Sequence, residues 1–475
     1  MRERGSPRQV GRMTISTDTL TTALGPHFHG EVVGSDNPGY DAVRALDNHC
    51  FESRPRAVVR CTDADDVVAG IRLASSEGLP LAVRAGGHSA GFGSVEDGLV
   101  IDLRPIDHVR VDPDQHVVAI GGGSLASAVD RGTHEFGLAT TTPTVSTVGM
   151  TGFTLSGGIS HLTRKHGLAV DNLVGADVVL ADGSRVRAGA DGDEDLLWAL
   201  AGGGGNLGVV TEVRMRLHPV SIVTGGPMLF PLERSERLVR LFRDWMPHQA
   251  DDIYAYLALL TVPPAGGPFP DELRGSAVCA LFWCNTAAED RSAEALATFR
   301  AEGPLLDLVG QLPYPVLQSM GDAAAGAGKY GQLAGLLFQD LPDAAAARFE
   351  HWGATMPTPL CLTHLYPLDG AAARADRGDT AWPWREAAFA QMYAAQAPVP
   401  GVERELRAWA TGFRDALAPY ALPGWYANFL MDEGPEAARA CYGANADRLA
   451  HLKGRYDPEN LFRRNQNIAP RTPTD

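Results

Sequence analysis

The feature that most constrains the fold is an apolar run that leads directly into a pair of glycines. Leu81-Ala-Val83 is followed by Arg84-Ala85-Gly86-Gly87-His88-Ser89-Ala-Gly91. Two adjacent residues without a Cβ let a backbone lie against a ligand, and the free N–H groups of such a turn form a concave anion site. The segment therefore predicts a strand that enters a diphosphate-binding loop.

His88 gives this loop a possible chemical role. A neutral imidazole at the rim of a dinucleotide pocket can act as a nucleophile or a base on the cofactor. The alternative is a surface turn whose histidine is only solvated, because short motifs are weak evidence when taken alone. Other segments must decide between the two.

Composition restricts the class of protein. A length of 475 residues predicts two or three domains, and 41 Lys+Arg against 57 Asp+Glu give a net charge of -16. Such a chain repels nucleic acid and anionic membranes, and it has no apolar run of about 18 residues that would span a bilayer. The start, Met1-Arg-Glu-Arg, lacks the apolar core of a secretory signal, so we expect a cytoplasmic protein with disorder over residues 1–15. Six cysteines without a CxxC pair argue against zinc and against a disulfide framework.

The first half of the chain is rich in short strands. Asp63 begins an amphipathic helix that ends at Gly78, and a further helix covers residues 125–136. Strands are expected at 81–83, 99–103, 117–120 and 209–217, with a hairpin at 178–186 around an Asp-Gly turn. This half predicts a mixed domain that includes antiparallel strands.

The composition changes after about residue 220. Proline-rich joints alternate with alanine-rich stretches at 287–300, 344–351 and 384–396, for which we expect helices. We place a second α+β domain at 223–429, followed by a tail that is helical from Asn445 until Pro458 breaks the pattern.

Two more glycine-rich loops accompany the first. Gly203-Gly-Gly-Asn-Leu-Gly208 matches GxGxxG, but a helix precedes it and a strand follows it, which is the reverse of a nicotinamide-type Rossmann site. The second loop covers residues 147–158. Three glycine loops together with Arg84 and His88 fit one long dinucleotide better than several unrelated turns.

These segments resemble the berberine-bridge-enzyme-like, or hydroxynicotine-oxidase-like, flavoproteins of the vanillyl-alcohol-oxidase superfamily. The matching segments occur in family order at 84–91, 144–158, 164–172, 195–211 and 456–467. The resemblance implies an α+β fold in which FAD is held by a two-part PCMH-type domain, at 30–222 and 430–475. It also implies that the 223–429 domain binds substrate and covers the isoalloxazine ring with an antiparallel sheet.

The resemblance assigns His88 as the residue that carries the flavin covalently through its 8α-methyl group. Many relatives add a thioether from a cysteine in Cys-Pro-x-Val-Gly, and Val145 stands in that place here, so a single attachment is expected. The residues expected to contact FAD are Arg84, Ala85, Gly86, Gly87, His88, Ser89, Gly91, Thr144, Val145, Thr147, Val148, Gly149, Gly152, Gly157, Gly158, Gly208, Val209, Val210, Asn465 and Asn467.

In this family, catalysis is hydride transfer from carbon to flavin N5 with the help of a base. Tyr426-Ala-Asn428-Phe429 is similar to the strand that lines the family's pocket, which makes Tyr426 the first candidate for the base. The alternative is a buried tyrosine with a satisfied hydroxyl. His364 is on a segment similar to a substrate-domain strand facing the flavin, although a surface position is equally compatible with a lone histidine. His27 and His29 have metal-ligand spacing but no neighbouring third ligand in sequence, so no metal is expected.

The function expected from these features is that of an FAD-linked oxidase. It would oxidise a small organic molecule, such as an alcohol, sugar, amine or natural-product intermediate, and pass the electrons to O2 to give H2O2. The alternatives are a flavin-dependent dehydrogenase with another acceptor and a flavoprotein that sequesters a drug-like ligand without turnover. We expect a monomer or homodimer with no nucleic-acid or membrane partner.

Overall fold

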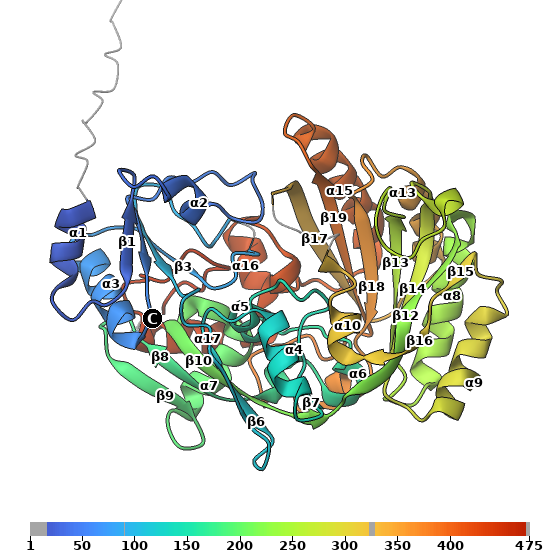
Figure 1. Cartoon of the computed structure of the whole chain (residues 1–475), viewed down its shortest axis with the longest axis horizontal. Coiled ribbons are helices and arrows are strands. Elements are labelled where there is room, and N and C mark those ends of the chain that lie inside the picture. Colours follow the sequence, from blue (N-terminus) through green and yellow to red (C-terminus); the bar gives the residue numbers. More distant parts are fainter. Residues whose placement is uncertain (1–16, 90, 323–327, 472–475) are drawn as a thin grey trace, which may run out of the picture.

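The computed structural model describes residues 17–89, 91–322 and 328–471 as an α+β protein (Figure 1). The expected disorder at 1–15 lies outside the described residues. Strands from the first half of the chain occupy one side of the molecule, and strands from the middle of the chain occupy the other. Over the described ranges, each helix is too short or too polar to span a bilayer.

The first sheet has the order β1-β2-β4-β3 and carries the glycine loop at one strand end. β4 runs parallel to both β2 and β3, so Arg84 at the end of β3 lies opposite Asp102. The Asp63 carboxylate accepts a hydrogen bond from the Asp66 N–H and caps α3, as expected for an N-terminal Asp. The elements are α1 (Thr17–Leu24), β1 (Glu31–Gly34), α2 (Tyr40–Arg44), β2 (Ala57–Arg60), α3 (Ala64–Ser76), β3 (Leu81–Arg84) and β4 (Leu99–Asp102).

A second, antiparallel sheet has the order β5-β6-β10-β8-β9. The expected hairpin is present, with Gly183 at a φ of 81° that suits glycine. Val213 and Met215 of β10 are buried, as the alternation predicts. The elements are β5 (Val109–Asp112), β6 (Val117–Gly121), α4 (Ala126–His134), β7 (Leu138–Ala139), α5 (Met150–Leu155), α6 (Thr163–His166), β8 (Leu173–Val179), β9 (Arg185–Gly189), α7 (Glu194–Gly203), β10 (Val209–Arg216) and β11 (His218–Pro219).

A large antiparallel sheet in the order β15-β12-β14-β13-β18-β19-β17, with β16 also on β12, forms the other side of the molecule. Helices α8, α9, α13 and α15 lie along it (Figure 1). The bounds are β12 (Ile222–Pro231), α8 (Ser235–Trp245), β13 (Ala255–Thr261), β14 (Ala277–Asn285), α9 (Glu289–Arg300), β15 (Leu306–Asp307), β16 (Gly310–Pro313), α10 (Tyr314–Gln318), β17 (Tyr330–Phe338), α12 (Asp343–Ala346), α13 (Arg348–Ala354), β18 (Leu362–Pro367), α14 (Ala371–Arg374), β19 (Phe389–Ala397), α15 (Glu403–Leu417), α16 (Pro435–Cys441) and α17 (Ala446–Tyr456).

The expected helix at 384–396 is wrong, because most of that segment is strand β19. Its alanines favour a helix in isolation. Within the sheet, however, β19 pairs with β17 on one side and with β18 on the other, and most of its residues are buried. Pairing on both edges and burial on both faces override the local propensity.

The chain returns to the first half through α17. Lys453, fully buried on this helix, donates to the carbonyl oxygens of Asn206 and Phe462 and to the Asp457 carboxylate. α17 packs against α7 (Figure 1). The tail thereby contacts the glycine loop at 203–208, although the exact domain limits given above stay a prediction.

Candidate active site

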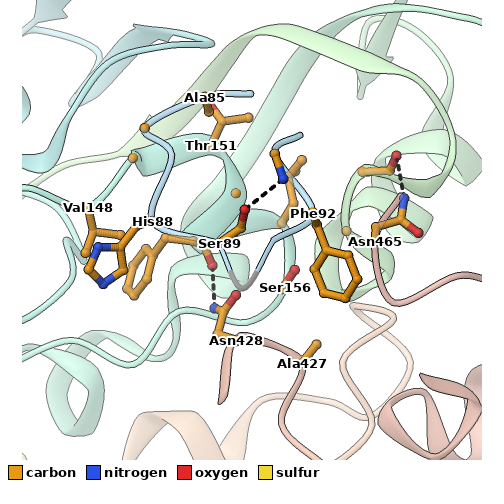
Figure 2. A pocket seen from close by; sticks show the side chains of 18 of the residues that line it. Ala85, His88, Ser89, Phe92, Val148, Thr151, Ser156, Ala427, Asn428 and Asn465 are labelled. Atoms are coloured by element: carbon orange, nitrogen blue, oxygen red, sulfur yellow. Dashed lines mark hydrogen bonds between the residues drawn. The ribbon is translucent and has the colours of Figure 1, made fainter. Parts of the chain in front are cut away.

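A cavity of about 390 Å³ brings together segments that are far apart in the sequence. Its walls are the loop after β3, residues 143–156, the loop at 204–210, the segment 426–430, the tail at 462–466, and individual residues of β17, β18 and β19. Figure 2 shows His88 and Val148 toward one end of this pocket and Asn465 toward the other. Its volume falls in the range of cofactor and small-molecule sites.

Most of the predicted cofactor contacts line this cavity. The lining includes Arg84, Ala85, Gly86, Gly87, His88, Ser89, Thr144, Val145, Val148, Gly149, Gly152, Gly208, Val210 and Asn465, together with Tyr426 and His364. Within the described residues, Gly91, Thr147, Gly157, Gly158, Val209 and Asn467 lie outside the lining.

Packing explains several of the positions outside the lining. Gly91 faces the ring of Phe51, where an added Cβ would lie 2.5 Å from a ring carbon. Val209 alternates with Val210 along β10 and packs into a different cluster, with Val179. Gly158 is separated from the cavity by Tyr426, which lines it, and donates its N–H to the Tyr426 hydroxyl.

Gly86 and Gly149 let two of the loops cross. A Cβ built on Gly86 would lie 2.6 Å from the backbone nitrogen of Gly149, closer than side-chain carbons tolerate. Glycine is therefore required at this crossing because the two loops touch there. Their contact holds the His88 and Val145 segments at one wall of the cavity.

The Arg84 guanidinium donates hydrogen bonds to the backbone around it. Its Nε donates to Gly93 O at 3.1 Å, Nη1 to Val43 O at 2.5 Å and Nη2 to Arg44 O at 2.8 Å. Burial lowers the pKa of this guanidinium to about 10, with a further contribution from Arg104. Arg84 touches the cavity, but these bonds direct its donors to the chain at 43–45 rather than to a diphosphate.

His88 has a carboxylate partner that the sequence did not indicate. Its Nδ1 lies 3.0 Å from Oδ2 of Asp47, and the imidazole remains 37% exposed at the cavity. A carboxylate on one ring nitrogen fixes the ring orientation and the tautomer.

Tyr426 is buried with its hydroxyl accepting two hydrogen bonds. The donors are the Gly158 N–H at 2.6 Å and the Asn428 amide at 3.1 Å. Burial raises the pKa of Tyr426 to about 12, although both donors oppose this rise. The expected strand here is wrong, since residues Ala427–Phe429 form a 3-10 turn.

His364 and Tyr366 form a pair on β18. Nδ1 of His364 lies 2.5 Å from the Tyr366 hydroxyl, and Tyr256 packs against both rings. Burial lowers the pKa of His364 to about 3 and raises the pKa of Tyr366, so both are neutral near pH 7. The structure places His364 at the cavity and not on the surface.

Comparisons with known proteins relate the chain to flavoproteins. The FAD binding domain family matches residues 55–189, and the berberine and berberine-like family matches residues 425–469. An uncharacterized FAD-linked oxidoreductase of Bacillus subtilis is 28% identical over 449 residues, which cover 93% of this chain and 97% of that protein. The chain thus carries both an FAD binding domain and a berberine-like domain, and the relatives that it matches are FAD-linked oxidoreductases. (R)-6-hydroxynicotine oxidase of Paenarthrobacter nicotinovorans is 35% identical over 234 residues, about half of each chain.

Solved structures of berberine-bridge-enzyme-like proteins confirm the expected fold. The crystal structure of 6-hydroxy-D-nicotine oxidase from Arthrobacter nicotinovorans superposes with a TM-score of 0.83 at 26% identity, covering 95% of this chain and 99% of that one. Glucooligosaccharide oxidase from Acremonium strictum, described with a 6-S-cysteinyl, 8α-N1-histidyl FAD, has the same fold at a TM-score of 0.84 and 20% identity, covering 95% of this chain and 99% of that one.

The residues present fit the flavin cofactor of this family. Thr151 Oγ1, Arg464 Nε and Asn465 Oδ1 line the cavity, are buried, and have no hydrogen-bond partner in the part of the chain that the structure describes. Buried polar atoms of this kind require a partner, and a dinucleotide supplies both donors and acceptors. Apolar side chains such as Val148 and Leu333 line other parts of the same cavity, as a ring system requires.

Several cavity residues were missed by the sequence interpretation. Phe92, Asn206 and Arg464 belong to segments that the motifs already identified, so attention to the non-glycine positions would have found them. Leu333 and Met392 come from β17 and β19 and carry no local signal, because only the sheet topology brings them to the cavity.

His29 does have carboxylate neighbours in the fold. Its side chain, Asp63 and Asp66 offer ligand atoms within 4.8 Å of one another. Asp63 caps α3, and Asp66 accepts hydrogen bonds from the backbone N–H groups of His29 and Thr62. The carboxylates are thus engaged in capping, and the absence of a metal stays a prediction.

Proposed function

We propose that the chain is an FAD-linked oxidase that removes a hydride from a carbon of a small organic substrate and passes the electrons to O2 as H2O2. The observation that supports this most is the shared cavity, which joins the His88 loop to Tyr426 and to the His364–Tyr366 pair. Substrates of this kind include an alcohol, a sugar, an amine or a natural-product intermediate.

Bound FAD supplies the hydride acceptor and the route to oxygen. We propose that His88 carries it covalently, that the glycine loops bring backbone close to it, and that Asn465 supplies hydrogen bonds at the far end. On the opposite wall, β17, β18 and β19 cover the cavity and exclude water from the reacting carbon.

Tyr426 is the proposed base that takes the substrate proton. The Gly158 N–H and the Asn428 amide already point at its oxygen, so they stabilise the charge that ionisation leaves there. Because its pKa is raised to about 12, the ionised fraction increases with pH throughout the neutral and mildly alkaline range. The rate of flavin reduction is therefore expected to rise with pH over this range.

Tyr426→Phe is expected to slow flavin reduction by about 10²–10⁴-fold, the usual contribution of a positioned base. The substitution keeps the ring and removes only the hydroxyl, so folding and flavin content should be preserved. Anaerobic stopped-flow reduction, followed by bleaching of the flavin band, measures this step separately from oxygen chemistry. The rise of rate with pH should also disappear in the variant.

Tyr366→Phe is the matched control, because it removes a hydroxyl from the other candidate at the same cavity. If Tyr426 is the base, Tyr366→Phe should change reduction far less than Tyr426→Phe. The reverse order of effects would transfer the role to the His364–Tyr366 pair and leave the flavoprotein assignment intact.

Two measurements distinguish the proposed oxidase from a flavin-dependent dehydrogenase and from a flavoprotein that sequesters a ligand. Fast reoxidation of the reduced flavin by air supports an oxidase, whereas slow reoxidation supports a dehydrogenase with another acceptor. A substrate screen coupled to peroxide detection identifies the substrate class. Ligand binding without any reduction of the flavin would instead indicate a sequestering protein.

No cysteine is expected to join the flavin. Val145 lines the cavity where relatives of this family place the second link, and none of the six cysteines, all within the described residues, is part of the lining. Peptide mapping of the flavin-labelled protein should recover only the peptide that contains His88. A labelled peptide carrying any cysteine would contradict this, and Val145→Cys provides a positive control for a second link.

A further inference from the structure

We propose that the substrate of this site is an uncharged aromatic alcohol, an inference that rests on the oxidase function proposed above and narrows it. The evidence is the part of the cavity formed by the large sheet and the segment 426–429, which we call the substrate wall. Apart from one imidazole and one amide, its side chains are apolar or aromatic. They are Leu333 of β17, His364 and Tyr366 of β18, Met392 of β19, and Tyr426, Asn428 and Phe429.

The substrate wall carries no charge. Over the ranges that the structure describes, no aspartate or glutamate lines the cavity, and its two arginines belong to the glycine loop and the tail. Arg84 is bound to the carbonyls of residues 43–45, and Arg464 is bound to two carbonyls of the loop after β3. Burial lowers the pKa of His364 to about 3, so this imidazole is neutral near pH 7. A protonated amine or a carboxylate would therefore lie against the wall without a counter-ion, which is costly once water is excluded.

Most polar atoms of the substrate wall already have partners. The Tyr366 hydroxyl lies 2.5 Å from Nδ1 of His364 and also hydrogen-bonds to Thr144. The Asn428 amide donates to the Tyr426 hydroxyl and to a backbone carbonyl. Besides the proposed base, the described residues of the wall thus leave His364 Nε2 and Asn428 Oδ1 for a ligand. A sugar has a hydroxyl on most of its carbons, and several would be buried unpaired, whereas a single hydroxyl can be satisfied.

The apolar surface of the wall is made largely of rings. Phe429 meets Tyr426 edge-on, with centroids 4.6 Å apart, and lies within 25° of parallel to Tyr366 at 6.0 Å. Met392 is the direct cross-strand partner of His364, so its thioether lies on the same face of the sheet as the imidazole. Ring edges, ring faces and a polarisable sulfur all pack well against an aromatic ligand.

The reaction of such a substrate gives an aldehyde. The carbon that carries the hydroxyl loses a hydride to the flavin, and the O–H proton passes to ionised Tyr426, so a C=O bond forms. Dioxygen then takes up the two electrons and two protons as H2O2. The one hydroxyl of the substrate therefore both anchors it and reacts.

The experiment titrates the holoenzyme anaerobically with 2-naphthalenemethanol, 2-naphthylmethylamine, 2-naphthoate and cellobiose at pH 7. The three aryl probes share one ring system and differ in charge. A shift of the flavin absorption band reports binding, and its bleaching reports reduction. The alcohol should bind at least about 10²-fold more tightly than the protonated amine or the carboxylate, because only the charged probes lose hydration without gaining a counter-ion. Cellobiose should give neither response.

Two variants test which residues set this preference. His364→Leu should weaken binding of the alcohol by about 10-fold and leave 2-methylnaphthalene, which lacks the hydroxyl, unaffected. Met392→Glu places a carboxylate on the wall and should shift the preference toward the amine by about 10-fold or more. Met320→Glu is the matched control, since Met320 is 44% exposed and outside the lining, and it should leave the preference unchanged.

The outcomes separate this inference from the oxidase proposal. Binding of the alcohol without bleaching would support the ligand class and count against the oxidase. Reduction of the flavin by cellobiose would overturn the aromatic alcohol and leave the oxidase intact. The inference also fails if the amine or the carboxylate binds as tightly as the alcohol, or if the alcohol produces no spectral response. These wild-type measurements decide the matter even if a variant does not fold.

Discussion

His88→Ala is expected to abolish covalent flavin completely, leaving apoprotein or a chain from which acid precipitation releases all of the FAD. The imidazole is the proposed nucleophile at the cavity wall, and alanine offers no atom that could form the bond. The measurement is flavin fluorescence of the denatured chain on a gel, with total flavin determined by extraction.

His166→Ala is a useful control, because that histidine is partly buried in a stack with His218 and does not line the cavity. It should retain the covalent flavin in whatever fraction of the protein folds. A covalent flavin that persists in His88→Ala would show that another residue makes the link.

Lys453→Met is expected to destabilise the protein by about 3–5 kcal/mol, the cost of leaving one member of a buried ion pair without its partner. Lys453 and Asp457 are both fully buried, and their charged atoms lie 2.5 Å apart. The substitution also frees the carbonyls of Asn206 and Phe462, which belong to the cavity segments. Urea denaturation should show the lower stability, and FAD retention should fall with it.

Arg448→Met on the same helix provides the comparison. Arg448 pairs with Asp195 where both side chains are 50% exposed, and its guanidinium stacks on the Trp198 ring. Losing this exposed pair and one cation–π contact should cost less than breaking the buried Lys453–Asp457 pair. Equal loss of stability in the two variants would mean that the tail is held by α17 as a whole and not by the buried contacts of Lys453.

The sequence predicted the fold of the glycine-loop side of this protein well, and for identifiable reasons. Glycine pairs, the Asp63 cap and the alternation of Val213 and Met215 are local signals that tertiary contacts did not override. The resemblance carried by the order of the motifs assigned His88 and the loop residues to one site, and most of them line one cavity in the structure.

The substrate side was less predictable, because its elements depend on strand pairing across long distances. Residues 384–396 have helical composition but form a strand between two others. Asp47 is separated from His88 by 41 positions and carries no motif, so only the fold reveals the contact. The same holds for Tyr366, which meets His364 because β18 places alternate residues on one face.

The return of the tail has a consequence for biosynthesis. Phe462, Arg464, Asn465 and Gln466 form part of the cavity wall, yet they are translated long after the glycine loops that form the facing wall. A ribosome-bound chain that has completed only its first half can form the glycine loops but cannot close them around FAD. The complete cavity first exists when residue 466 has left the ribosome, so tight cofactor loading must wait until that segment has been synthesised.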